Sequence, residues 1–118
     1  MAVNLDIFKT QYLQHDVSAQ IGRLVENLTQ IKAVAQAGTE EKLAQDLIRE
    51  SQFFVEWIVS SLNLDTNLDL ASELVELQRQ LSRWKLHWSK LWLSSGDRLQ
   101  IARCSQEWSD RLFKSHMR

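Results

Sequence analysis

The sequence predicts an all-α protein, an antiparallel up-and-down four-helix bundle that forms a single domain over residues 1–118. Three observations lead to this prediction. The 118-residue chain contains no proline, although average usage of ~5% would place several in it. Apolar residues recur every three or four positions in four successive segments, which is the pattern of helices with one buried face. The three connections between these segments are short, as expected for antiparallel neighbours.

The N-terminal segment, residues 1–15, does not continue the pattern that follows it. Leu5, Phe8 and Tyr12 fall roughly opposite the apolar stripe that begins at Val17 when the chain is turned by about 100° per residue. We therefore expect either a short separate helix that ends near residues 15–16, or one long helix whose N-terminal face meets a different neighbour.

The first periodic segment runs from Val17 to Ala35 with apolar residues alternately four and three positions apart. Gly38 is expected to end this helix in a positive-φ conformation. Thr39 is expected to be the N-cap of the next helix, because Glu40 and Glu41 place acids in its first turn.

The second helix is predicted from Leu43 to Leu62 and the third from Leu70 to Leu91, separated by a stretch rich in turn formers at residues 63–67. Residues 53–59 are aromatic and β-branched, which also suits a strand. Their flanks are helical in pattern on both sides, so we predict helix.

The fourth helix is predicted around Ile101 to Leu112, after a break at residues 94–97 in which Gly96 is expected to form a turn. A Glu107–Arg111 pair at i,i+4 supports it. Cys104 lies in the apolar stripe of this helix, so we expect it to be a small buried hydrophobic residue.

Two histidine patterns are similar to those of known helical enzymes. His87 and Lys90 have the His-x-x-Lys spacing of histidine phosphotransfer domains, but Leu91 and Trp92 follow where those domains leave the imidazole accessible. Arg111 and His116 have the Arg-x4-His spacing of HEPN-type ribonucleases, in which such residues handle phosphate charge and proton transfer. The pattern is only two residues long, and the residue after the arginine is apolar.

The sequence contains no recognisable metal-binding or cofactor-binding motif. The single cysteine has no cysteine partner, no Glu-x-x-His is present, and the chain has neither a glycine-rich phosphate loop nor a Gly-x-Ser-x-Gly sequence. We therefore expect a protein that is not an enzyme and that has no catalytic residue, cofactor or metal.

Charge is distributed unevenly along the chain, whose net charge is −1. Residues 1–76 hold five Lys or Arg against twelve Asp or Glu, and residues 77–118 hold nine against three. The basic C-terminal third contains four tryptophans, at positions 84, 88, 92 and 108, and a nucleic-acid-associated regulator is therefore the alternative function. The tryptophans also recur at core spacing, and oppositely charged neighbouring helices can serve to select the topology.

More apolar surface is present than one bundle needs, because a bundle helix buries a stripe about 100° wide. The residues left over on the second and third helices are the candidate interface: Ile48, Val55, Val59, Val75, Leu86 and Leu93. Such a face is covered either by the N-terminal segment or by another chain. Self-association through a twofold interface is the commoner solution, so we expect a homodimeric adaptor or regulator that contacts itself or another protein.

The compartment is expected to be the cytoplasm. Only one cysteine is present, and residues 1–4 show neither the basic segment nor the long apolar run of a secretory signal. Uninterrupted apolar stretches are far shorter than the ~20 residues of a membrane-spanning helix, so no membrane span is expected.

Overall fold

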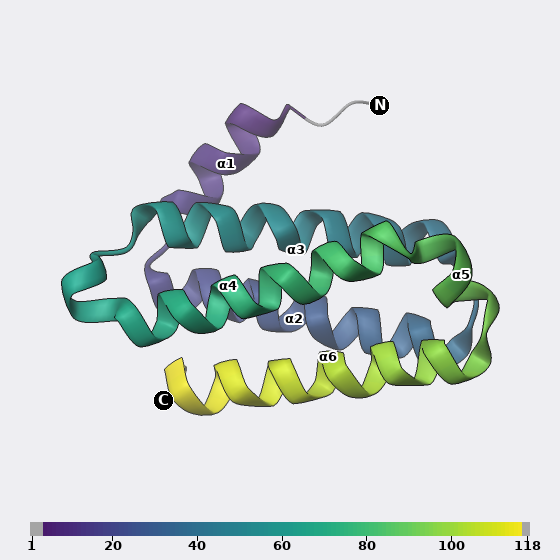
Figure 1. Ribbon diagram of the computed structural model, residues 1–118. Coiled ribbons are helices and arrows are strands. Elements are labelled where there is room, and N and C mark those ends of the chain that lie inside the picture. Colours follow the sequence, from purple (N-terminus) through teal and green to yellow (C-terminus); the bar gives the residue numbers. More distant parts are fainter. Residues whose placement is uncertain (1–3, 117–118) are drawn as a thin grey trace.

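The computed structural model describes residues 4–116, and this range is helical apart from short connections (Figure 1). It contains no strand between residues 4 and 116, so the all-α prediction is confirmed, including helix over residues 53–59. The six helices of this range, in chain order, are α1 (Leu5–Leu13), α2 (Val17–Ala37), α3 (Glu41–Ser61), α4 (Leu64–Leu86), α5 (Trp88–Leu93) and α6 (Ser95–His116).

The N-terminal segment forms the short separate helix that was one of the two alternatives. The Asn4 side chain caps α1 by accepting hydrogen bonds from the backbone amides of Asp6 and Ile7. The Asp16 carboxylate then caps α2 by accepting from the amide of Ala19 at 2.8 Å. Because Asp16 starts a new helix only three residues after α1 ends at Leu13, α1 and α2 are two helices and not one.

The connection between α2 and α3 confirms one local prediction and contradicts another. Gly38 ends α2 in the left-handed conformation, with φ 70°. Thr39, however, is not the N-cap of α3. That position is taken by Glu40, which has φ 57° and makes no side-chain capping bond. Because the turn contains two left-handed residues, the helix starts one residue later than the sequence pattern suggests.

The predicted third helix is interrupted at His87, whose φ of −104° and ψ of 18° separate α4 from α5. The break turns α5 toward α6 at the end of the molecule (Figure 1). There Trp88 and Trp92 stack with their ring centroids 5.1 Å apart, and the Trp88 indole N–H donates to Glu41 at 3.4 Å. The stacked rings and this hydrogen bond hold α5 in place after the break.

The break before the last helix is shorter than predicted. Ser94 is the non-helical residue, and its hydroxyl accepts from the amide of Asp97 at 3.3 Å. Gly96 lies in the first turn of α6, and among residues 4–116 it is Gly38 alone of the glycines that has a positive φ. The expectation that Gly96 forms a turn is therefore wrong.

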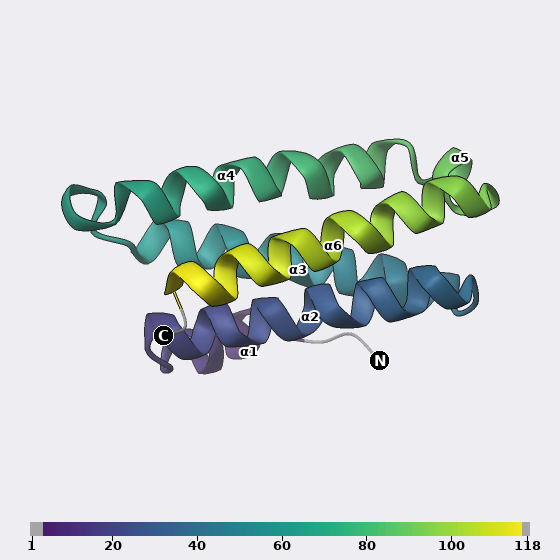
Figure 2. The same cartoon turned by 90° about the horizontal axis from the view of Figure 1, so that it is seen from below.

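Successive long helices run in opposite directions, and α2 lies between α3 and α6 (Figures 1 and 2). The α2–α6 pairing is the most extensive in the protein. Small side chains of α6, Ala102, Ser105 and Ser109, are buried, and the last of these reaches the Thr29 hydroxyl of α2 at 3.4 Å. On its other side α3 packs against α4, and α1 stands outside the long helices against α3.

The core runs the length of the long helices and consists of leucine, isoleucine and aromatic side chains. Its largest fully buried members are Tyr12, Phe54, Ile21, Leu24, Leu28, Ile31, Ile58, Leu74, Leu77, Leu81, Ile101 and Leu112. None of the helices within residues 4–116 is sufficiently long and apolar to cross a membrane.

Candidate interaction surface

The six predicted interface residues differ in exposure, and Val59 is intermediate. Val75, Leu86 and Leu93 are exposed, with 45%, 78% and 85% of their surface accessible. Ile48 and Val55 are only 2% exposed within the chain itself. The reason is that α3 contacts α1, α2 and α4, so it needs apolar residues around more than the single stripe of a simple bundle helix. These two residues therefore do not form free surface.

A groove of about 750 Å³ lies between α3 and α4. It is lined by four of the six predicted residues, Val55, Val59, Val75 and Leu86. Ile48 instead lines a smaller cavity beside Trp88, while Leu93 lies beyond the groove on α5. The sequence pattern thus identified most of the apolar part of one continuous surface, which we call the α3–α4 groove.

Hydrogen bonds between polar side chains join α3 to α4 beside the groove. The Gln52 amide donates to the Ser82 hydroxyl at 3.2 Å, and the Gln78 amide donates to the Gln52 backbone carbonyl at 3.3 Å. Next to this contact, Val55, Val59 and Val75 line the groove. Part of its lining is consequently apolar.

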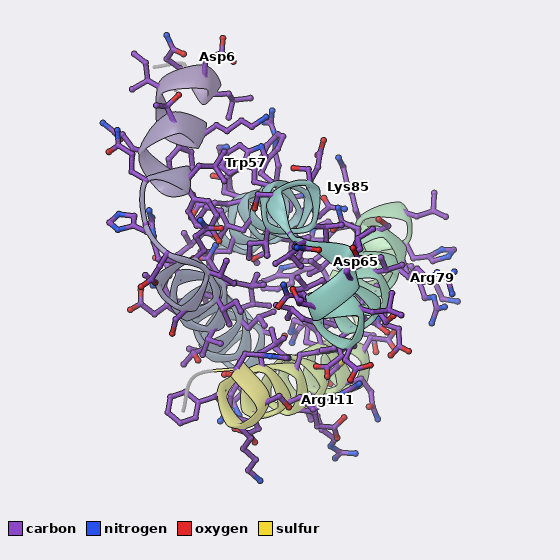
Figure 3. All side chains as sticks on the ribbon, turned by 90° about the vertical axis from the view of Figure 1, so that its left-hand side faces the viewer. Asp6, Trp57, Asp65, Arg79, Lys85 and Arg111 are labelled. Carbon is purple, nitrogen blue, oxygen red and sulfur yellow. The ribbon has the colours of Figure 1, made fainter. Side chains whose placement is uncertain are left out.

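Charges of opposite sign lie on the two sides of the groove. Glu56 is on the α3 side, and Arg79 and Arg83 are on the α4 side. None of the three makes an ion pair within residues 4–116. Figure 3 shows Arg79 projecting outward from α4. The sequence analysis did not single out these residues, although Arg79 falls on the same helical stripe as Val75 and Leu86.

The N-terminal helix covers a different face of α3. Tyr12 stacks on Phe54 with centroids 4.2 Å apart, and Phe8 meets both Phe54 and Trp57 edge to face. Figure 3 shows Trp57 on the α1 side of the molecule, away from Arg79. The residues that line the α3–α4 groove include none from α1. Within the described residues, α1 therefore leaves the groove open.

The four tryptophans of the basic third are all buried, as their core spacing predicts: Trp84, Trp88, Trp92 and Trp108. Their rings are therefore not available as an exposed platform on which bases stack. The Arg111 guanidinium lies over the Trp108 ring at 4.3 Å, which further covers it.

The residues with enzyme-like spacing are arranged as follows. His87 is exposed at the break between α4 and α5. Arg111 and His116 each face a carboxylate of α4, with Arg111 3.7 Å from Glu76 and the His116 imidazole 3.6 Å from Glu73. These contacts join α6 to α4, which gives both side chains a structural role.

Cys104 is half-buried and packs against the core, with burial, and to a lesser extent the nearby Glu107 carboxylate, raising the pKa of its thiol. A raised pKa keeps the thiol protonated and unreactive near neutral pH. Between residues 4 and 116, no three His, Cys, Asp or Glu side chains are grouped closely enough to hold a metal ion.

Comparison of the chain with known protein families, with curated proteins and with solved structures finds no match.

Proposed function

We propose that the protein is a small, non-enzymatic interaction protein of the cytoplasm that forms a homodimer through the α3–α4 groove and acts as an adaptor or regulator. The observation that supports this proposal is the groove itself. An isolated exposed leucine is ordinary on a protein surface. Here the exposed Val75 and Leu86 line the same depression as the partly exposed Val59, so one docked apolar surface would contact all three.

The fold that carries this surface is proposed to be an antiparallel, up-and-down four-helix bundle of α2, α3, α4 and α6. The opposite directions of successive long helices support it (Figure 1). So does the end-on view, in which these four helices lie around a common centre with α1 outside them (Figure 3). In such a bundle the groove is an outer face that the fold itself does not need.

Leu86→Glu is the variant that tests self-association. Burying one leucine side chain contributes about 1.5–3 kcal/mol, and an unpaired carboxylate in a desolvated contact adds a cost of similar size. A twofold dimer contains this site twice. We expect the dimer dissociation constant to rise by about 100-fold or more, with the circular dichroism spectrum and thermal unfolding of the protomer unchanged.

The matched control is Leu99→Glu on α6. Leu99 is also exposed, at 56%, but it does not line the groove. Sedimentation velocity over a concentration series should report a dimer for the wild type and for Leu99→Glu, and a folded monomer for Leu86→Glu. Val55→Glu is unsuitable because that side chain is buried within its own chain. A wild type that stays monomeric at high micromolar concentration would refute self-association.

The alternative function, regulation through nucleic acid, is supported by the unpaired Arg79 and Arg83 beside the groove. Binding through phosphate contacts is strongly salt-dependent. Retention on random DNA at low salt that disappears as salt rises, and that is weakened by Arg79→Ala, would favour this alternative. Absence of retention at low salt would remove it.

A further inference from the structure

The signs of the charges beside the groove restrict how two copies can meet. Glu56 lies on the α3 side, and Arg79 and Arg83 lie on the α4 side, all without an ion-pair partner within residues 4–116. A twofold axis that runs across the groove, perpendicular to the helices, would set the α3 side of one copy against the α3 side of the other, and α4 against α4. Like charges would then face each other. A twofold axis along the groove would set the α3 side of one copy against the α4 side of the other. Charge complementarity favours the second arrangement.

The height of each residue along the groove identifies the charged pair. Gln52 donates a hydrogen bond to Ser82 and accepts one from Gln78, so it lies level with about residue 80 of α4. Since α3 and α4 run in opposite directions and a helix rises 1.5 Å per residue, Glu56 is level with about residue 76. Arg79 is then about 5 Å away along the groove.

Rotation about a twofold axis along the groove leaves these heights unchanged. Arg79 of the second copy therefore lies beside Glu56 of the first. Arg83 is one helical turn farther along and about 10 Å from that height. Arg79 is therefore the partner of Glu56. Each dimer contains this pair twice, once on each side of the axis.

We infer that two copies dock groove to groove about a twofold axis parallel to the helices, so that α3 and α4 of both copies form one intermolecular four-helix bundle in which Glu56 of each copy pairs with Arg79 of the other. This inference rests on the proposed self-association. Each helix in the bundle has antiparallel neighbours, because α3 is antiparallel both to its own α4 and to the α4 of the second copy. The assembly is closed and self-limiting.

The residues that line the groove form layers suited to the core of such a bundle. Val59 and Val75 lie at similar heights and form one apolar layer, with the buried Val55 beneath them, while Leu86 forms another layer toward the far end. Between them lies a polar layer of Gln78 and Ser82, both of which are hydrogen-bonded to Gln52 of α3. A polar layer in an otherwise apolar helical core fixes the register of the helices.

The test is a complementary charge reversal in the full-length chain. Glu56→Arg sets two guanidinium groups against each other at both sites, and Arg79→Glu sets two carboxylates together at both. Each variant alone should raise the dimer dissociation constant by about tenfold or more at low ionic strength, and less at high salt. An equimolar mixture of the two variants also allows mixed dimers. In a mixed dimer, one site pairs the unchanged Arg79 of one variant with the unchanged Glu56 of the other, and the second site pairs the two substituted side chains. Opposite charges therefore face each other at both sites.

The mixture should therefore dimerise within about threefold of the wild-type dissociation constant, and the dimers should contain one copy of each variant, which a mass tag on one of them reports. The double variant Glu56→Arg/Arg79→Glu should also recover. The control Glu26→Arg changes an exposed acid on α2 that lies outside the groove and should dimerise like the wild type.

The possible results separate the inference from the proposed function. If the wild type dimerises and Leu86→Glu dissociates it, but the mixture does not recover, the register is wrong and self-association through the groove stands. Reversals that change the dissociation constant no more than Glu26→Arg also overturn the register. A wild type that is monomeric overturns both.

Discussion

Tyr12 allows the packing of α1 to be tested at a single side chain, because it is the only tyrosine in the chain and is fully buried. Its hydroxyl donates to the backbone carbonyl of Gln20 at 2.6 Å, and its ring stacks on Phe54 at an interplanar angle of 1°. The side chain therefore fixes α1 both to the start of α2 and to the middle of α3. Tyr12→Phe removes only the first contact, whereas Tyr12→Ala removes both.

The expected losses differ in size. Tyr12→Phe removes one buried hydrogen bond, which contributes about 0.5–1.5 kcal/mol. The Gln20 carbonyl lies within α2 and keeps its helical donor, so it is not left without a partner. Tyr12→Ala also removes the ring and should cost about 3–5 kcal/mol. Urea unfolding followed by circular dichroism measures both values.

Alkaline pH gives a second, independent measurement on the same residue. Burial of the hydroxyl raises the pKa of Tyr12 well above its ordinary value, and Glu50 adds to this while Arg23 opposes it. Because the pKa is raised in the folded state, the stabilisation is complete below the unfolded pKa of about 10 and is lost as pH rises above it. Tyr12→Phe should unfold with less dependence on pH in this range.

The ultraviolet absorbance of phenolate reports Tyr12 alone, since no other tyrosine contributes. In the folded protein it should appear only well above pH 10, together with alkaline unfolding. A phenolate that appears near pH 10 in a protein still fully helical would show that the ring is accessible. Equal stability of wild type and Tyr12→Phe would refute the hydrogen bond to Gln20, and equal stability of wild type and Tyr12→Ala would refute the docking of α1 described above.

Two further stability predictions follow from the packing. Trp108→Ala should cost about 3–5 kcal/mol in urea unfolding, because the indole is buried between α6 and the core; a stability equal to wild type would mean that the ring is exposed. Gly38→Ala should cost about 1–2 kcal/mol, since φ is +70° and a Cβ there would lie 3.0 Å from the Arg98 Nε. Gly96→Ala is the matched contrast and should gain about 0.5–1 kcal/mol, because Gly96 is helical and the nearest atom to its Cβ is 3.7 Å away. Thermal unfolding that orders the two glycine variants the other way would contradict this reading of the backbone.

The helices were predictable because their signals are local. The apolar stripe from Val17 to Ala35 and the absence of proline act within one helix, and Gly38 ends that helix for a reason of backbone sterics. The break at His87 has no such signal, since no proline or glycine is near it. It depends on how Trp88 and Trp92 pack, which only the assembled fold determines.

The candidate surface was predictable in part for the same reason. Val75 and Leu86 fall outside the core stripe of α4 by helical geometry alone. Val55 and Ile48 were assigned to an outward face because the count of neighbours around α3 was not known from the sequence. The sequence alone could not show that Glu56 of α3 and Arg79 of α4 line the same groove, because that depends on how the two helices pack.

The pairing of α2 with α6 has a consequence for biosynthesis. The apolar stripe of α2, with Leu24, Leu28 and Ile31 buried in the finished protein, is covered on one side by α6, which the ribosome makes only after α3, α4 and α5. At about 5–20 residues per second, the ribosome needs several seconds to add the stretch from the end of α2 to the middle of α6. During that interval the nascent chain displays a row of uncovered aliphatic side chains, which is the kind of segment that chaperones bind. Premature termination before α6 would leave this row permanently uncovered, so truncated chains should be cleared by proteases instead of accumulating as folded fragments.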